Sequence, residues 1–179
     1  MLVNSDRFGS IEVDAEDAIC FPQGVIGFPN DDTFVLLRPR EDARIAWLQS
    51  TRTPALALPV VSLHMTAIDA PLDAIATAIQ ELQIAQDPDD CAVLLVLTAT
   101  PGSRPTVNLL APIIVNSATR TGVQALLEID ARSLETPLCL RPEGEPTITS
   151  VEETTNTTDH TINNTTTNAA TTAMYDSAE

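Results

Sequence analysis

The chain has 179 residues with 25 acidic and nine basic side chains, and its net charge is −16. All the basic residues are arginine, and aromatic residues make up only 3% of the sequence. Binding to nucleic acid is therefore not expected, because it depends on clustered basic side chains and on aromatic stacking.

The acidic balance leaves two interpretations open. A basic protein partner would complement such a surface, since opposite fields speed encounter. Alternatively, the excess of acids reflects genome composition or a salty cytoplasm. The N-terminal residues lack the features of a signal peptide, and no apolar run is long enough to span a bilayer. We therefore expect a cytoplasmic protein with no membrane partner.

Composition divides the chain into a body, residues 1–146, and a tail, residues 147–179. The tail is rich in Thr and Asn, and it carries five acids and no base. Such a segment buries too little apolar surface to offset its ordering entropy. We therefore predict one folded domain followed by a disordered acidic tail. The body is long enough to form a proper hydrophobic core.

Short apolar stretches bounded by turn residues make up the first part of the body. Residues 7–21 predict a strand, a turn and a second strand, because apolar residues alternate on both sides of the sequence DAED. Residues 21–32 hold two glycines and two prolines and predict a structured loop. Residues 34–38 and 45–50 predict a hairpin, and residues 56–65 predict a further strand interrupted by a proline.

Only residues 72–84 change to a helical period, with Ile75, Ile79 and Leu82 on one face. Strand-like segments then resume at residues 91–100, 107–116 and 122–129, and residues 132–138 close the body. A parallel α/β sheet would need a helix after nearly every strand. The pattern predicts a mainly β, compact, antiparallel β-barrel-like domain with one short helix.

Residues with reactive side chains are few and scattered. Cys20, Cys91 and Cys139 show no metal-ligand spacing, so we expect reduced, buried thiols and no cofactor. His64 is the only histidine of the body and is interpreted as structural. A small hydrolase that uses His64 with a nearby acid is the enzymatic alternative.

The aromatic residues of the body lie in its first third, and two interpretations were considered for them. They form either a ligand-binding box or the bulky part of an otherwise aliphatic core, which is the favoured interpretation. The residues concerned are Phe8, Phe21, Phe28, Phe34 and Trp47.

The stretch VNLLAPIIVN, residues 107–116, combines a strand-like apolar content with a central proline, which cannot donate a ladder hydrogen bond. Alternation assigns Val107 and every second residue after it to the core. The other face is a candidate partner-binding surface, although it could instead pack under the helix while Pro112 shapes a barrel corner. The residues of this candidate surface are Asn108, Leu110, Pro112, Ile114 and Asn116.

Several stretches, taken together and in order, resemble the bacterial flagellar assembly factor FliW family. The matching stretches are RFGSIEVDAEDAICFPQGVIGF (7–28), WLQS (47–50), VNLLAPIIVN (107–116), RTGVQ (120–124) and RSLETPL (132–138). They cover the body, and the tail extends beyond the usual end of the family. The family's glycine loop usually carries a proline where this chain has Ile26, so we expect a less rigid turn here.

The resemblance implies a regulator that is not an enzyme and is monomeric. Proteins of this family bind CsrA, a small basic translational repressor, and relieve its repression of flagellin mRNA. They also bind flagellin, which competes for them. A flagellin chaperone without a role in translation is the alternative within the binding class. The resemblance also implies a compact, mostly antiparallel, barrel-like domain.

Overall fold

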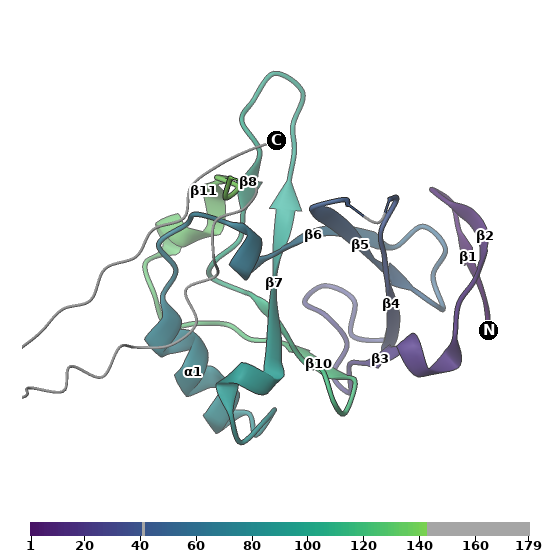
Figure 1. Ribbon diagram of the computed structural model, residues 1–179, viewed down its shortest axis with the longest axis horizontal. Coiled ribbons are helices and arrows are strands. Elements are labelled where there is room, and N and C mark those ends of the chain that lie inside the picture. The colour runs from purple at the N-terminus through teal and green to yellow at the C-terminus, as the bar shows by residue number, and fades with distance from the viewer. Residues whose placement is uncertain (41, 143–179) are drawn as a thin grey trace, which may run out of the picture. The chain divides into compact units, whose positions relative to one another are not determined.

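The computed structural model describes residues 1–40 and 42–142 (Figure 1). The strands are β1 (Leu2–Ser5), β2 (Gly9–Glu12), β3 (Ile19–Cys20), β4 (Thr33–Leu37), β5 (Ile45–Ser50), β6 (Ala57–Ser62), β7 (Cys91–Thr98), β8 (Thr106–Val107), β9 (Ile113–Asn116), β10 (Thr121–Gln124) and β11 (Thr136–Pro137). The helices are α1 (Leu72–Glu81) and the short 3-10 helices η1 (Ala15–Asp17), η2 (Leu63–Met65), η3 (Pro88–Asp90) and η4 (Ala131–Glu135). The predicted disordered tail, residues 147–179, lies outside the described residues.

The main sheet closes on itself. Strands β7, β6, β5, β4, β3, β10 and β9 pair in that order, and β9 pairs again with β7. The predicted mainly β, barrel-like domain is therefore confirmed. Fully antiparallel pairing is wrong at one contact, because β10 lies parallel to β3 through Thr121 and Cys20. A ring of seven strands cannot alternate direction all the way round, so one neighbouring pair must run parallel.

Strands β1 and β2 form a separate antiparallel ribbon at the N-terminal end of the domain (Figure 1). Strand β1 was not predicted, because only Val3 and Ser5 of its four residues are buried and no alternation of apolar residues marks it. Hydrogen bonds between Met1 and Val13 extend the ribbon at its open end.

The barrel interior is filled by side chains from most strands of the ring. Phe21 and Phe34 lie at its centre, fully buried, with their rings edge-to-face at 5.2 Å. The core interpretation of the aromatic residues is confirmed for these two. It is wrong for Phe28, which is 40% exposed, because Phe28 lies at the tip of the glycine loop. Phe8 and Trp47 are half-buried and pack against each other at 5.8 Å.

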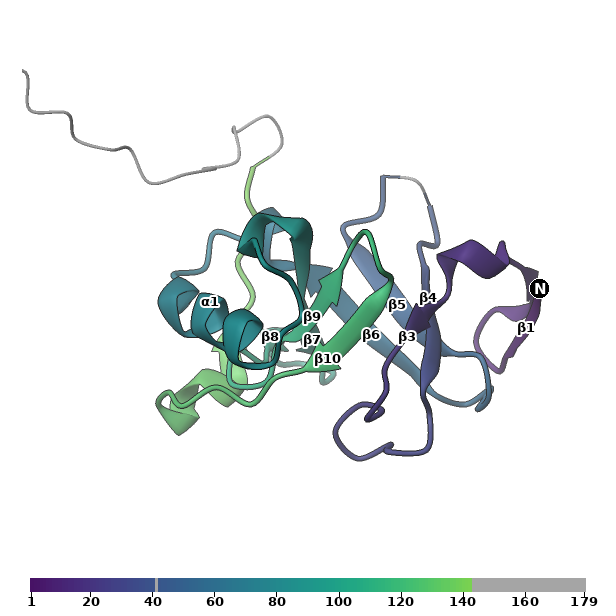
Figure 2. The same ribbon diagram turned by 90° about the horizontal axis from the view of Figure 1, so that it is seen from below.

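Helix α1 covers one side of the ring, beside β7, β9 and β10 (Figure 2). The predicted helix is confirmed, although it ends at Glu81 and Leu82 is not on its buried face; Ile75 and Ile79 pack on Ile114 of β9. Leu72 and Leu82, at the two ends of the helix, remain 64% and 46% exposed. The described helices are all too short or too polar to cross a membrane.

The expectation that the three cysteine thiols are buried is wrong, because Cys20 and Cys139 are exposed and Cys91 is only partly buried. Cys20 is exposed between the buried Ile19 and Phe21, and Cys139 is exposed between the half-buried Leu138 and Leu140. Burial, together with the neighbouring Asp90 carboxylate, raises the pKa of the Cys91 thiol.

Candidate partner-binding site

The stretch 107–116 is not one continuous strand. It forms β8 and β9, which pair with the same strand β7 on either side of a bulge at residues 108–112. Leu94 of β7 pairs with Ile113, and Leu97, three residues further along β7, pairs with Val107, which is six residues before Ile113. The three extra residues produce the bulge. The central proline therefore stands next to β9 in a bulge, where no ladder donor is required.

The bulge is held by hydrogen bonds from outside the ladder. The carbonyl oxygen of Leu110 accepts from the Leu127 backbone N–H at 2.8 Å, and that of Pro112 accepts from the Ala125 N–H at 3.0 Å. Within the bulge, the Ala111 N–H donates to the Asn108 side-chain oxygen at 3.0 Å. These bonds satisfy three of the backbone groups that the interrupted strand leaves without a ladder partner, so the bulge has a defined shape.

The five predicted site residues are not on one exposed face. The opposite set, which begins with Val107, is buried as predicted. Within the candidate set, however, Ile114 is fully buried and packs under α1, the alternative that the sequence left open. Pro112 is also buried, whereas Asn108 and Leu110 keep part of their surface exposed.

Asn116 is 7% exposed and joins two elements. Its side-chain nitrogen donates to the Ile84 carbonyl just beyond α1 at 2.9 Å. Its side-chain oxygen accepts from the N–H groups of Ala118 and Thr119, both at 2.9 Å, in the turn between β9 and β10. Asn116 therefore fixes the end of the helix against this turn.

Gln124 connects the glycine loop to the bulge. Its side-chain oxygen accepts from the Ile26 N–H at 2.9 Å, and its side-chain nitrogen donates to the Ala111 carbonyl at 3.1 Å. A proline at position 26, usual in the family that the chain resembles, could not donate the first bond. The glycine loop, which was expected to be less rigid without the proline, is therefore held to β10 by the hydrogen bond that the Ile26 N–H donates to Gln124.

Exposed apolar side chains gather on the segments that Gln124 joins. Ile26 is 59% exposed, Phe28 40% and Leu126 70%. We define the bulge patch as these three residues together with the partly exposed Leu110 and Asn108, because hydrogen bonds from Gln124 and between Leu127 and Leu110 join the segments that carry them. Sequence reasoning found only Asn108 and Leu110, although Gln124 and the glycine loop both lie in stretches that carry the family resemblance.

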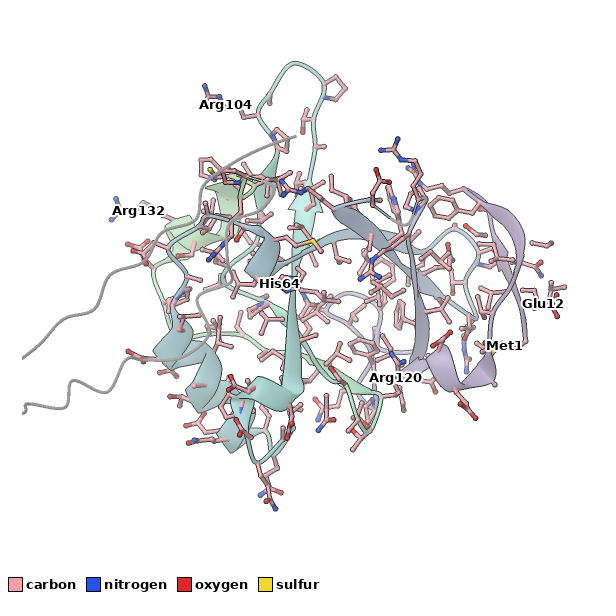
Figure 3. The ribbon with its side chains drawn as sticks, viewed as in Figure 1. Met1, Glu12, His64, Arg104, Arg120 and Arg132 are labelled. Atoms are coloured by element: carbon pink, nitrogen blue, oxygen red, sulfur yellow. The ribbon has the colours of Figure 1, made fainter. Side chains whose placement is uncertain are left out.

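The single histidine of the body is exposed on η2 (Figure 3), and it lines neither the cleft beside the end of α1 nor the shallower one at Arg7 and Pro54. The Ser62 hydroxyl lies 2.7 Å from Nδ1 of His64. Among the described residues, the ring makes no hydrogen bond to a carboxylate, and no three His, Cys, Asp or Glu side chains are placed to hold a metal ion. Nothing in this geometry favours the hydrolase alternative.

A model of the FliW family, described as FliW protein, matches residues 2–138. The chain belongs to the FliW family. The flagellar assembly factor FliW of Syntrophotalea carbinolica is 33% identical over 132 residues, which cover 74% of this chain and 94% of that protein. The corresponding FliW protein of Moorella thermoacetica is 35% identical over 130 residues, covering 72% and 82%.

A crystal structure of a flagellar assembly factor FliW has the same fold. It is 31% identical to this chain and superposes with a TM-score of 0.64, covering 81% of this chain and all of the solved one. The resemblance to the FliW family is therefore confirmed. The family match ends at Leu138, just after β11, so the closed barrel and its helix both lie inside the part that FliW proteins share.

Proposed function

We propose that this FliW protein is a cytoplasmic regulator that acts by binding proteins and not by catalysis. It binds a CsrA-type translational repressor and so relieves repression of flagellin mRNA. Flagellin is the competing partner: while it is bound, the repressor is free. The chain acts as a monomer and contacts neither RNA nor a membrane directly.

The observation that carries this proposal is the bulge patch. Exposed large apolar side chains are costly to leave in water, and when they cluster they mark interaction sites. Here Ile26, Phe28 and Leu126 are held on a closed barrel through Gln124 and the bulge, so little order is lost when a partner covers them. From the predicted set, Asn108 and Leu110 contribute directly and Pro112 is a buried part of the bulge. Ile114 and Asn116 are engaged instead with α1 and with the turn after β9.

The experiment is a calorimetric titration of the full chain with purified CsrA-type repressor and, separately, with flagellin. Leu126→Gln and Leu110→Glu are compared with Leu134→Gln, which changes another exposed leucine, 51% exposed, on η4. We expect both patch variants to weaken binding of at least one partner by about tenfold or more, since an apolar anchor is lost. The control variant should bind as the unaltered chain does.

Two results would overturn parts of this proposal. If flagellin binds but the repressor does not, the protein is a flagellin chaperone without a role in translation. If both patch variants stay folded and bind both partners unchanged, the bulge patch is not a partner surface.

A further inference from the structure

A recess lies at the C-terminal end of α1, beside the start of the glycine loop. It is a cleft of about 380 Å³, and we call it the helix-end groove. Three segments form its walls: the start of the glycine loop, the residues that follow α1, and β10 with the turn before it. The lining residues are Pro22, Gln23, Gly24, Leu82, Gln83, Ile84, Thr119, Thr121, Gly122 and Val123.

The walls of the groove are fixed before any partner arrives. Asn116 joins two of them through its bonds to Ile84 and Thr119. In the third wall, Gly24 has a φ of +66°, and an added Cβ would lie 2.4 Å from the Phe28 carbonyl oxygen. A surface that is already ordered loses little entropy on binding. The groove is therefore a preformed recess with Leu82 exposed at its edge.

The charge around the groove is strongly negative. Between Arg52 and Arg104 the sequence contains six acidic residues and no basic one. Glu81 directly precedes Leu82, and the η3 acids stand beside the opposite wall, because the Asp90 carbonyl accepts from the Ser117 N–H at 3.1 Å. Of these six exposed acids, Glu81, Asp87, Asp89 and Asp90 lie at the groove end of α1, whereas Asp69 and Asp73 lie just before it and in its first turn.

Basic side chains lie mainly elsewhere. Arg120, in the turn that forms one wall, is paired with Asp17 at 3.4 Å. Arg7 stacks over the Trp47 ring at 3.9 Å, on the outer side of β5. Figure 3 shows Arg104 and Arg132 at the end of the domain away from the groove. A basic partner therefore meets an attractive field at the helix-end groove.

We propose that the helix-end groove receives an apolar side chain from a basic segment of the repressor. Leu82 and Val123 contact that side chain, while Glu81, Asp89 and Asp90 pair with the Lys or Arg residues that flank it. This inference rests on the proposed function, because the basic occupant is the repressor named there. It adds the surface on which the repressor docks. The groove and the bulge patch share the glycine loop, so a partner on one surface can exclude a partner from the other.

The test measures repressor affinity of full-length variants at two salt concentrations. Leu82→Gln removes the apolar contact, and Leu72→Gln is its matched control, since it makes the same change at the other exposed end of α1. Asp89→Asn with Asp90→Asn removes charge at the groove. Asp6→Asn with Glu12→Gln removes equal charge from the ribbon of β1 and β2; Glu12 lies at the far end of the domain from α1 (Figure 3).

We expect Leu82→Gln to weaken repressor binding about tenfold and Leu72→Gln to leave it within about twofold. The groove charge variant should bind about three- to tenfold more weakly at low salt, with a flatter salt dependence than the control pair. Flagellin binding by each variant reports that the fold is intact, and it should be unchanged.

The outcomes separate the two proposals. If the unaltered chain binds the repressor and Leu82→Gln and the groove charge variant bind it equally well, the groove assignment is overturned while the proposed function stands. Loss of flagellin binding along with repressor binding would also overturn the groove as a dedicated site. Failure of the unaltered chain to bind the repressor overturns both proposals together.

Discussion

Gly122 in β10 stands against the ring of Phe21. An added Cβ would lie 2.5 Å from Cζ and 2.6 Å from Cε1 of that fully buried side chain. The ring cannot move away, because it packs edge-to-face on Phe34. We expect Gly122→Ala to lower the free energy of unfolding by about 1–3 kcal/mol, as overpacking of a core does. Urea denaturation measures this change.

A double variant separates overpacking from other effects of the same substitution. Phe21→Leu shortens the side chain that the new methyl group meets. The two changes together should therefore cost less than the sum of the single costs. Strictly additive costs would show that the ring does not limit the residue at position 122.

Gln49 donates hydrogen bonds inside the turn between β5 and β6. Its side chain is fully buried, and the amide nitrogen lies 3.0 Å from the carbonyl oxygens of both Ser50 and Leu56. Its side-chain oxygen has no hydrogen-bond partner among the described residues. Replacing Gln49 with methionine, which is similar in size, would therefore remove only the hydrogen bonds that the amide nitrogen donates. Gln49→Met should lower the free energy of unfolding by about 2–4 kcal/mol, since two buried carbonyls lose a donor.

The control for this prediction is Gln80→Met on the exposed face of α1, where a change within about 0.5 kcal/mol is expected. Thermal and urea unfolding of both variants measure the difference. Equal stabilities of the two variants would contradict the role assigned to the Gln49 amide.

At the scale of elements, β9 is covered on both faces. Ile113 and Val115 face the barrel core, and Ile114 packs beneath Ile75 and Ile79 of α1. Ile114→Ala should therefore lower the free energy of unfolding by about 2–5 kcal/mol, because it leaves a cavity between strand and helix.

Leu110→Ala is the comparison, because Leu110 lies in the bulge and is only half-buried. This substitution should lower the free energy of unfolding by only about 1 kcal/mol, and it should weaken partner binding more than it lowers stability. Chemical denaturation and partner titration of both variants measure the two effects. The face assignment would be wrong if Ile114→Ala left stability unchanged and reduced partner binding alone.

Elements made of neighbouring residues were predictable. The hairpin of β4 and β5 follows from two apolar runs around a polar connection, and the pairing of Leu36 with Leu48 matches it. Helix α1 follows from apolar residues at a spacing of three and four. In both cases the deciding contacts are local, so the pattern of one segment contains the information.

Features that depend on distant segments were not predictable. The bulge in 107–116 depends on β8 and β9 sharing one partner strand in different registers. The burial of Ile114 depends on α1, about 35 residues earlier in the chain, which alternation within a strand does not report. Ile26 and Gln124 are 98 residues apart, and no local pattern joins them.

At the scale of the whole molecule, the closed ring explains why the domain tolerates short strands. Strand β3 pairs with β10 through one residue pair, yet the Cys20 N–H still donates to the Arg120 carbonyl at 2.8 Å. Closure removes most of the free strand edges to which other chains could add. Outside the ring, β8 pairs with β7 on one edge and with β11 on the other, and β11 is only two residues long.

The domain boundary predicted from composition leads to a test on the whole chain. Deleting residues 147–179 should change the free energy of unfolding by no more than about 0.5 kcal/mol, as for changes away from packed features. Thermal unfolding of the full and shortened chains measures it. A large drop in melting temperature on deletion would show that these residues dock on the domain.

The most direct measurement of the proposed partner switch follows fluorescence anisotropy of a labelled flagellin leader RNA bound to the CsrA-type repressor. The full chain is added first and flagellin second. The account predicts that anisotropy falls as the RNA is released and rises again when flagellin withdraws the chain from the repressor. Anisotropy that stays constant through both additions, with all components folded, would contradict the account.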